Sequence, residues 1–419
     1  MSLESVPGHE VHYHLLSYDR TGAACNTDSL AALAQASADR PTDVFVFSHG
    51  WNGDVPAARA QYGAWIATMA SSTAERERAR ALPGGFRSLC IGLHWPSKAW
   101  GDEEIGSTSF AVEPGVGPDE LASRMAGRLG DTPEVRAAVG TIVNSALEDP
   151  EPETLPRDVV AAYEAIDRFD DDNSVEGDRS PFDAELLYQG CRLEDDPVSF
   201  GGSSLGGILA PLQVLTFWKM KKRAMTFGES GAAVFVRELQ RCSPGSRIHL
   251  MGHSFGCIVA SAAAAGASRP VASLSLFQGA MSLWSYCSSI PARPDSAGHF
   301  RPVIDNRKVT GPIVVTTSVH DRAVGTFYPL GAWSGRQLAF DAEELPRYGG
   351  IGVHGLHGPD VDELSHSDVR YVDELTPGRV HNVDARSVVA TGSGIAGAHS
   401  DICHPELGRL VWRAVTSAR

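Results

Sequence analysis

The sequence predicts an α/β fold, in which a mostly parallel central sheet is flanked by helices and carries a large, mainly helical cap insertion. First, short and almost wholly apolar runs alternate with helix-length segments, as expected for strands buried on both faces of a parallel sheet. Second, a serine between two glycines stands at the junction of one such strand with a helix. Third, residues 97–228 interrupt the alternation for longer than a bare loop in a compact domain does.

The expected elements follow one another along the chain. Strands are predicted where apolar or β-branched residues form short runs, at residues 11–18, 43–48, 86–95, 248–251, 271–278, 313–319 and 381–389. Helices are predicted where apolar residues recur at helical spacing or small residues form a long run, at residues 28–38, 56–70, 120–129, 133–147, 155–169, 208–225, 230–240, 255–265 and 407–415. No internal repeat is visible.

Residues 252–256 read GHSFG and match the pattern G-x-S-x-G between a strand and a helix. A serine at the apex of so tight a turn needs neighbours without side chains, which Gly252 and Gly256 provide. The hydroxyl of Ser254 is therefore expected to point out of the sheet as a nucleophile. A second copy of the pattern surrounds Ser204, but no convincing strand precedes it. Ser254 is the preferred nucleophile.

A serine hydroxyl becomes a good nucleophile only when a base takes its proton and a carboxylate holds that base in its working tautomer. Asp321 follows a β-branched strand at residues 313–319, and catalytic groups gather at the carboxyl ends of strands in open α/β sheets. The competing carboxylates, Asp305 and Asp341, have no strand before them. Asp321 is therefore the expected acid of a Ser-His-Asp triad.

The base is expected near the C-terminus, because the triad order Ser, Asp, His places it last. His399 ends a loop of small residues at 391–400 that follows the last predicted strand. His404 is an alternative, although it lies at the start of the final helix. His253 is too constrained by the turn to act as the base and is expected to lie beside the site, in contact with substrate. His320, next to the acid, is at most a supporting residue.

Composition narrows the class of protein. The chain of 419 residues has 36 Lys plus Arg against 51 Asp plus Glu, a net charge of −15, which argues against a nucleic-acid partner. Seven cysteines without paired or ligand spacing indicate reduced thiols and no metal site. The N-terminus lacks signal-peptide features and no apolar stretch has membrane-spanning length, so we expect a cytoplasmic protein without stable membrane insertion.

The interruption at residues 97–228 divides the chain. Residues 1–96 and 229–419 are expected to form the α/β core, and residues 97–228 a cap or lid. Within the cap, residues 208–225 are apolar first and basic later, with Phe217 and Trp218 at the junction. This segment is predicted to be a lid helix over the site, an interfacial anchor, or a buried helix with an exposed basic end.

These motifs resemble those of the α/β-hydrolase superfamily, and in particular poorly characterised bacterial serine hydrolases of esterase or lipase type. The resemblance rests on the elbow at 252–256, the segment FVFSHGWN at 45–52, the Trp-Pro-Ser at 95–97 and the loop GAHSDI at 397–402. It extends over about residues 43–95 and 229–419. In this superfamily the backbone N–H groups of Trp51 and Phe255 would form the oxyanion hole.

The resemblance implies hydrolysis of a small-molecule carboxylic ester through an acyl-enzyme intermediate, without a cofactor. Phe217 and Trp218, in the cap, are expected to line an apolar substrate pocket. A thioesterase, acyltransferase or peptidase would use the same triad, and a non-catalytic binding protein could keep the fold. The sequence does not predict the acyl group or the oligomeric state.

Overall fold

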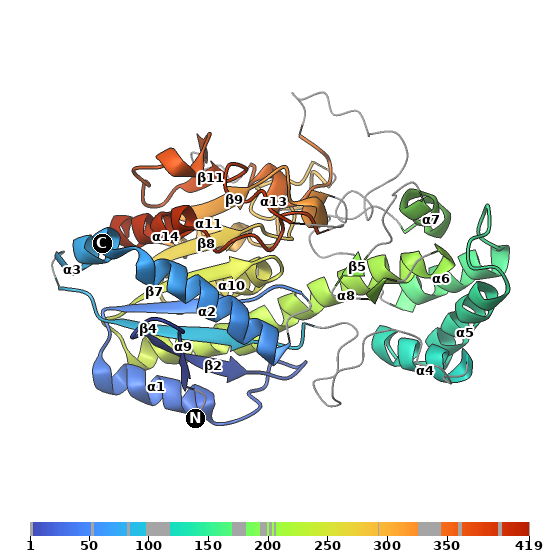
Figure 1. Ribbon diagram of the computed structural model, residues 1–419, viewed down its shortest axis with the longest axis horizontal. Coiled ribbons are helices and arrows are strands. Elements are labelled where there is room, and N and C mark those ends of the chain that lie inside the picture. Colours follow the sequence, from blue (N-terminus) through green and yellow to red (C-terminus); the bar gives the residue numbers. More distant parts are fainter. Residues whose placement is uncertain are drawn as a thin grey trace.

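The computed structural model describes residues 3–51, 54–81, 84–97, 118–169, 182–192, 199–200, 203–204, 207–291, 293–325, 345–358, 363–392 and 396–418. Their main feature is a nine-stranded sheet (Figure 1). Its strands, in sheet order, are β1 (Leu3–Ser5), β2 (His12–Ser17), β4 (Ser88–His94), β3 (Asp43–Ser48), β7 (Arg247–His253), β8 (Ser273–Phe277), β9 (Ile313–Thr317), β11 (Val380–Asp384) and β10 (Glu363–His366).

Every neighbouring pair in this sheet is parallel except β1 with β2, which is antiparallel. The prediction of a mostly parallel α/β sheet is confirmed. Because the strands run the same way, the residues that follow β3, β7, β8 and β9 meet at one edge of the sheet. The predicted nucleophile and acid follow two of these strands.

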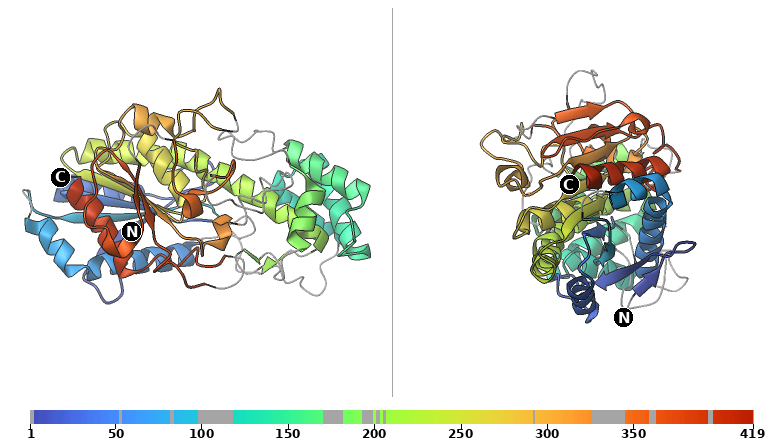
Figure 2. Two further views of the ribbon diagram at one scale, coloured as in Figure 1. Left: turned by 90° about the horizontal axis from the view of Figure 1, so that it is seen from above. Right: turned by 90° about the vertical axis from the view of Figure 1, so that its left-hand side faces the viewer.

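Helices cover both faces of the sheet (Figure 2). Those on one face are α1 (Asp28–Asp39), α8 (Ala210–Phe227), α9 (Ala233–Cys242), α10 (Gly256–Gly266), α11 (Arg301–Asp305) and α13 (Ile351–His354). Those on the other face are α2 (Val55–Ser71), α3 (Thr73–Ala81) and α14 (Pro405–Ser417). Strand β3 lies between the two layers and is buried along its whole length, as its apolar sequence requires.

A separate apolar cluster forms among the described residues between Ala122 and Leu215, at one end of the molecule in Figure 1. Its helices are α4 (Pro118–Leu129), α5 (Pro133–Glu148), α6 (Arg157–Phe169) and α7 (Ala184–Arg192). The first part of α8 packs in this cluster through Leu212 and Leu215, and its second part packs in the core under the sheet. Most of the described side chains of α8 are buried, which favours the buried-helix alternative for this segment.

Helix α8 continues into α9 through a π-helical turn, η2 (Gly228–Ala232). A Cβ on Gly228 would lie 2.7 Å from Cβ of Ala262, so this turn needs a glycine to pack on α10. The remaining short elements are η1 (Gly207–Leu209), η3 (Val369–Tyr371) and the two-stranded ribbon of β5 (Ser199–Phe200) and β6 (Ser203–Ser204).

Two predictions about the elements were incomplete. The last strand, predicted at 381–389, ends at Asp384, because the chain turns at residues 386–389. The short elements β1, α3, α7, α11, α13 and β10 were not predicted. Among the helices in the described ranges, none combines the length and the apolar composition needed to cross a membrane.

Candidate active site

Ser254 occupies the turn between β7 and α10 with φ of 56°, a left-handed conformation that costs energy for a residue with a side chain. The turn closes tightly enough that both flanking glycines are required. A Cβ on Gly252 would lie 2.3 Å from the carbonyl oxygen of Gly256. A Cβ on Gly256 would lie 2.1 Å from the carbonyl oxygen of Ser48 on β3. The backbone therefore has the strained strand–turn–helix form predicted for residues 252–256.

The structure brings Asp321 and His399 together, although they are 78 residues apart in the chain. Nδ1 of His399 lies 3.0 Å from Oδ1 and 2.9 Å from Oδ2 of Asp321. Because a carboxylate only accepts hydrogen bonds, Nδ1 carries the proton of a neutral His399 ring, and Nε2 is left as an acceptor. Both side chains are almost completely buried.

Gln278, which directly follows β8, fixes the orientation of the Asp321 carboxylate. Its amide Nε2 donates to Oδ2 of Asp321 at 3.0 Å and to the carbonyl of Gly352 at 3.0 Å, and its Oε1 accepts from the hydroxyl of Thr316. The N–H of Val324 donates to the other carboxylate oxygen at 3.0 Å. Gln278 also has a positive φ, 45°, so two residues with strained backbones lie at the ends of neighbouring strands.

The loop after β3 packs directly against the nucleophile. A Cβ on Gly50 would lie 2.5 Å from Cβ and 3.1 Å from Oγ of Ser254. Nδ1 of His49 donates to the carbonyl of Gly50 at 2.8 Å. In a trans peptide the C=O and the next N–H point in opposite directions, so this bond also sets the direction of the Trp51 N–H.

Hydrogen bonds fix both the backbone and the ring of His49. Its backbone N–H donates to the hydroxyl of Tyr62 at 2.8 Å, and its carbonyl accepts from the Trp95 indole at 3.2 Å. Its Nε2 accepts from Nδ1 of His94 at 3.0 Å, since Nδ1 of His49 already carries the proton. Burial, with the nearby His94, lowers the pKa of His49 to about 3, so the ring is neutral at neutral pH.

The second predicted oxyanion donor, Phe255, lies at the amino end of α10. Among the described residues, no backbone carbonyl accepts its N–H, and an N–H at this position faces an anion favourably. Its ring packs on Phe217 of α8 at 4.9 Å between centroids, and Phe217 also contacts the Trp51 ring at 5.8 Å. Trp218 packs beside Phe217. Of the two predicted pocket residues, Phe217 therefore lies against the side chains of the loop after β3 and of the elbow, and Trp218 packs on Phe217.

His253 is buried, and both of its ring nitrogens have protein partners, Gln61 and the carbonyl of His399. Neither nitrogen is therefore left to bind a ligand, and contact of His253 with substrate stays a prediction. His320 contributes its backbone carbonyl, which accepts from the N–H of Ala398 at 2.8 Å.

The rejected candidates lie elsewhere. Ser204 is in β6, Asp305 forms an ion pair with Arg301 on the surface, and Asp341 lies outside the described residues. His404 is at the start of α14, and its Nε2 lies 2.7 Å from Oδ1 of Asp401.

Sequence reasoning missed Gln278, Gln61 and the role of His49 and His94. Gln278 had one usable signal, since it is the last residue of the predicted strand at 271–278 and so lies at a strand end. The contacts of the others depend on which strands are neighbours, which the sequence does not show directly. Within the described ranges, no cluster of three His, Cys, Asp or Glu side chains could hold a metal ion.

Comparison with known families gives one match. A family model described as alpha/beta hydrolase matches residues 211–280, the segment that runs from α8 through the elbow to the end of β8. Comparisons with curated proteins and with solved structures gave no match. The match, together with the largely parallel sheet and the strained serine between β7 and α10, supports assignment to the α/β-hydrolase superfamily.

Proposed function

We propose that this α/β-hydrolase cleaves carboxylic esters of small molecules through a triad of Ser254, His399 and Asp321. Membership of the superfamily supports a hydrolase. The observation that carries the finer proposal is the pairing of Nδ1 of His399 with both oxygens of Asp321, at 3.0 and 2.9 Å, in a fold whose elbow bears Ser254. This pairing leaves Nε2 of His399 as the proton acceptor that a serine nucleophile requires.

In the first step, Oγ of Ser254 attacks the ester carbonyl while its proton passes to Nε2 of His399. Asp321 stabilises the imidazolium that forms and does not itself take the proton. The N–H groups of Trp51 and Phe255 hold the developing oxyanion. Such a donor contributes about 3 to 4 kcal/mol to the transition state, provided that it is fixed in advance. The bond from His49 to the Gly50 carbonyl supports that condition for the Trp51 N–H.

In the second step, His399 gives its proton to the leaving alcohol, which separates and leaves Ser254 acylated. A water molecule then loses a proton to the same Nε2 and attacks the acyl carbon. Collapse of the second tetrahedral intermediate releases the carboxylic acid, and the proton returns to Ser254. Every proton passes through His399, so its position relative to Ser254 limits both steps.

The substrate pocket is proposed to lie between the core and a cap formed by residues 97–228. Helix α8 connects the two regions, since its side chains pack both in the apolar cluster with α4 to α7 and in the core. Phe217, midway along α8, lies beside the rings of Trp51 and Phe255, and Trp218 packs on Phe217. This aromatic group favours an ester with an apolar acyl or aryl part.

The test is a substrate series on wild type and Ser254→Ala. We expect wild type to hydrolyse p-nitrophenyl esters between acetate and laurate faster than the matched acyl-CoA thioesters and anilides, and Ser254→Ala to be inactive on all. Faster turnover of thioesters or anilides would instead assign a thioesterase or a peptidase. Failure of wild type to hydrolyse any of them, or to react with a fluorophosphonate, would contradict the proposal.

A further inference from the structure

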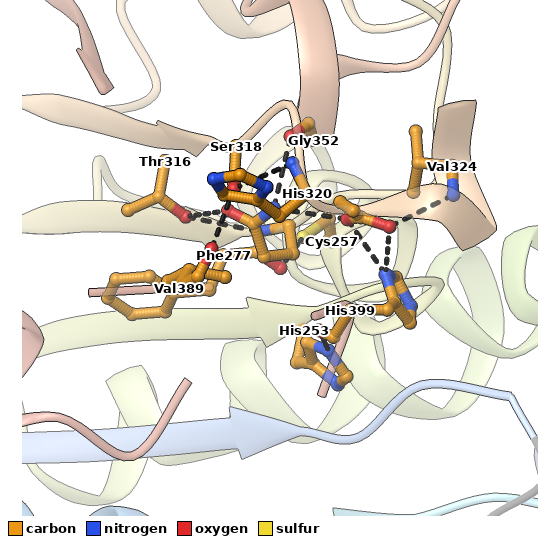
Figure 3. A network of polar contacts seen from close by, with 12 residues as sticks. His253, Cys257, Phe277, Thr316, Ser318, His320, Val324, Gly352, Val389 and His399 are labelled. Atoms are coloured by element: carbon orange, nitrogen blue, oxygen red, sulfur yellow. Dashed lines mark hydrogen bonds and ion pairs between the residues drawn. The ribbon is translucent and has the colours of Figure 1, made fainter. Parts of the chain in front are cut away.

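His253, the residue immediately before the proposed nucleophile, links the elbow directly to the loop that carries the proposed base. Its Nε2 lies 2.9 Å from the backbone carbonyl oxygen of His399, and its Nδ1 lies 2.8 Å from the amide Nε2 of Gln61 on α2. The two imidazole rings lie beside each other, with centroids 4.9 Å apart (Figure 3). His253 is 5% exposed, so water competes little for either bond.

These partners fix the protonation state of His253. A carbonyl oxygen only accepts, so Nε2 must carry the proton and donate it to His399. Nδ1 is then the acceptor for the side-chain amide of Gln61, which donates. Burial, together with the neighbouring His399, lowers the pKa of His253 to about 3. The ring is therefore neutral at neutral pH, and Gln61 favours the tautomer that can donate to His399.

Two other contacts connect His399 and its loop to the acid side of the site. Its ring is bonded to Asp321, and the N–H of the preceding residue, Ala398, donates to the carbonyl of His320 at 2.8 Å. These contacts fix His399 relative to the loop after β9. The bond from His253 fixes it relative to the loop after β7, where the nucleophile lies.

We propose that His253 is a positioning residue, whose Nε2–H holds the backbone of His399 at the distance from Ser254 that proton transfer requires. The inference rests on the proposed function, because it assigns His253 a part in that reaction. His253 and Ser254 are consecutive, so a bond to the first sets the distance from the second. A general base must lie within about 2.6 to 3.2 Å of its proton donor, and an error of about 1 Å costs about 10²-fold in rate.

The test compares two side chains of the same length, His253→Gln and His253→Met. The glutamine amide can reach the carbonyl of His399 as Nε2 of histidine does, whereas the methionine cannot donate. We expect His253→Met to lower kcat by about 10- to 100-fold with KM unchanged, and to slow fluorophosphonate labelling of Ser254 by the same factor. His253→Gln should stay within about 3-fold of wild type. Equal activity of the two variants, at any level, would overturn the inference.

Two further variants keep the test decisive if His253→Met does not fold. Gln61→Leu, at a partly exposed position, removes the hydrogen bond that fixes the tautomer of His253. We expect it to lower kcat by about 3- to 10-fold, less than His253→Met does. A wild-type rate for Gln61→Leu would count against the inference. His249→Gln, a buried histidine on the same strand, is the control, since it should lower thermal stability without changing kcat.

The labelling rate separates this inference from the proposed function. If wild-type Ser254 takes no label, the proposed function fails. If wild type is labelled and His253→Met is labelled equally fast, the proposed function stands and the role of His253 is wrong.

Discussion

Two sets of serine, histidine and aspartate lie at opposite ends of the central sheet. The carboxyl-end set is Ser254, His399 and Asp321. The amino-end set, near the starts of β8, β7 and β3, is Ser273, His249 and Asp43. In the second set, Nδ1 of His249 lies 2.8 Å from the Ser273 hydroxyl and Nε2 lies 3.1 Å from Oδ1 of Asp43. The distance from His249 to Asp43 is close to the 3.0 and 2.9 Å between His399 and Asp321.

The backbone around each serine distinguishes the two sets. Ser273 lies within β8 and is 2% exposed, whereas Ser254 lies on a left-handed turn before a helix. Asp43 is also bound by Arg247 through two hydrogen bonds of 2.9 Å, so its charge is already paired. The comparison shows that residue types and hydrogen bonds do not suffice to identify a catalytic serine. A strained turn with backbone donors, at the carboxyl ends of the strands, makes a serine a candidate nucleophile.

Exchanging each serine for alanine should produce the largest contrast between the sets. Ser254→Ala removes the nucleophile, and we expect kcat/KM for p-nitrophenyl esters to fall by about 10⁴-fold or more. Ser273→Ala should keep wild-type kcat but lower the free energy of unfolding by about 1 to 3 kcal/mol, because it removes a buried hydrogen bond to the imidazole of His249. Urea unfolding and ester kinetics measure the two effects. Equal loss of activity in both variants would contradict the distinction between the two sets.

Replacing the aspartate of each set should give the second largest contrast. In Asp321→Asn the amide no longer holds His399 in its working tautomer, and we expect kcat to fall by about 10³- to 10⁴-fold. Asp43→Asn should leave kcat unchanged and destabilise the fold by about 2 to 4 kcal/mol, because the buried His249 and the partly buried Arg247 lose their carboxylate. Ester hydrolysis assays measure kcat and chemical unfolding measures stability, so together they distinguish the outcomes. Wild-type kcat in Asp321→Asn would remove that residue from the site.

Two glycine-to-alanine variants test how closely the backbone packs beside each set. Gly50→Ala places a methyl group 2.5 Å from Cβ of Ser254, and we expect kcat to fall by about 10²-fold through displacement of the loop after β3. Gly245→Ala, between α9 and β7 near the amino-end set, meets nothing within 4 Å and should change neither kcat nor stability. The paired variants are assayed on the same ester. A fully active Gly50→Ala would show that this loop does not form part of the site.

The smallest effect is a difference in the pH range over which each end loses stability. His49 and His253 are buried and neutral, with pKa values lowered to about 3 chiefly by burial. Their unfolded forms take up protons below about pH 6.5, so stability falls as the pH drops from there towards about 3. His49→Asn, which keeps a donor for the Gly50 carbonyl, should reduce the loss between about pH 7 and pH 5 by about 2 kcal/mol.

The amino-end set responds at lower pH. Burial acts to raise the pKa of Asp43, but hydrogen bonds from His249, Arg247 and Thr42 outweigh it and hold the pKa well below its usual value. Its contribution to stability is therefore complete above about pH 5 and is lost below about pH 4, as the unfolded carboxyl takes up a proton. Asp43→Asn should flatten the unfolding free energy only in that lower range. A change confined to the range above pH 5 would contradict this assignment.

Much of the core could be predicted from the sequence, because its strands are buried on both faces and their apolar runs are continuous. The predicted strand at 43–48 has the bounds of β3, and the predicted elbow lies between β7 and α10. Edge strands β1 and β10 were missed because they are short and only partly buried, which leaves no continuous apolar run. The turn after β11 was missed because Val388 and Val389 have strand propensity without strand pairing.

For the candidate site, chain order and strand ends were enough to select Asp321 and His399, which the structure brings within hydrogen-bonding distance. The supporting contacts could not be predicted in the same way. Gln278 meets Asp321 because β8 and β9 are neighbours, and Gln61 meets His253 because α2 covers that face of the sheet. Sequence patterns report burial and turns, whereas these partners depend on the packing of distant segments.

The most direct test of the account is to locate the serine that reacts with a fluorophosphonate. Wild type, Ser254→Ala and Ser273→Ala are labelled at neutral pH, digested, and the modified peptide is identified by mass spectrometry. We expect one label per chain on Ser254 in wild type and in Ser273→Ala, and none in Ser254→Ala. A label on Ser273 or Ser204, or a label that persists in Ser254→Ala, would contradict the assignment of the active site to the carboxyl-end set.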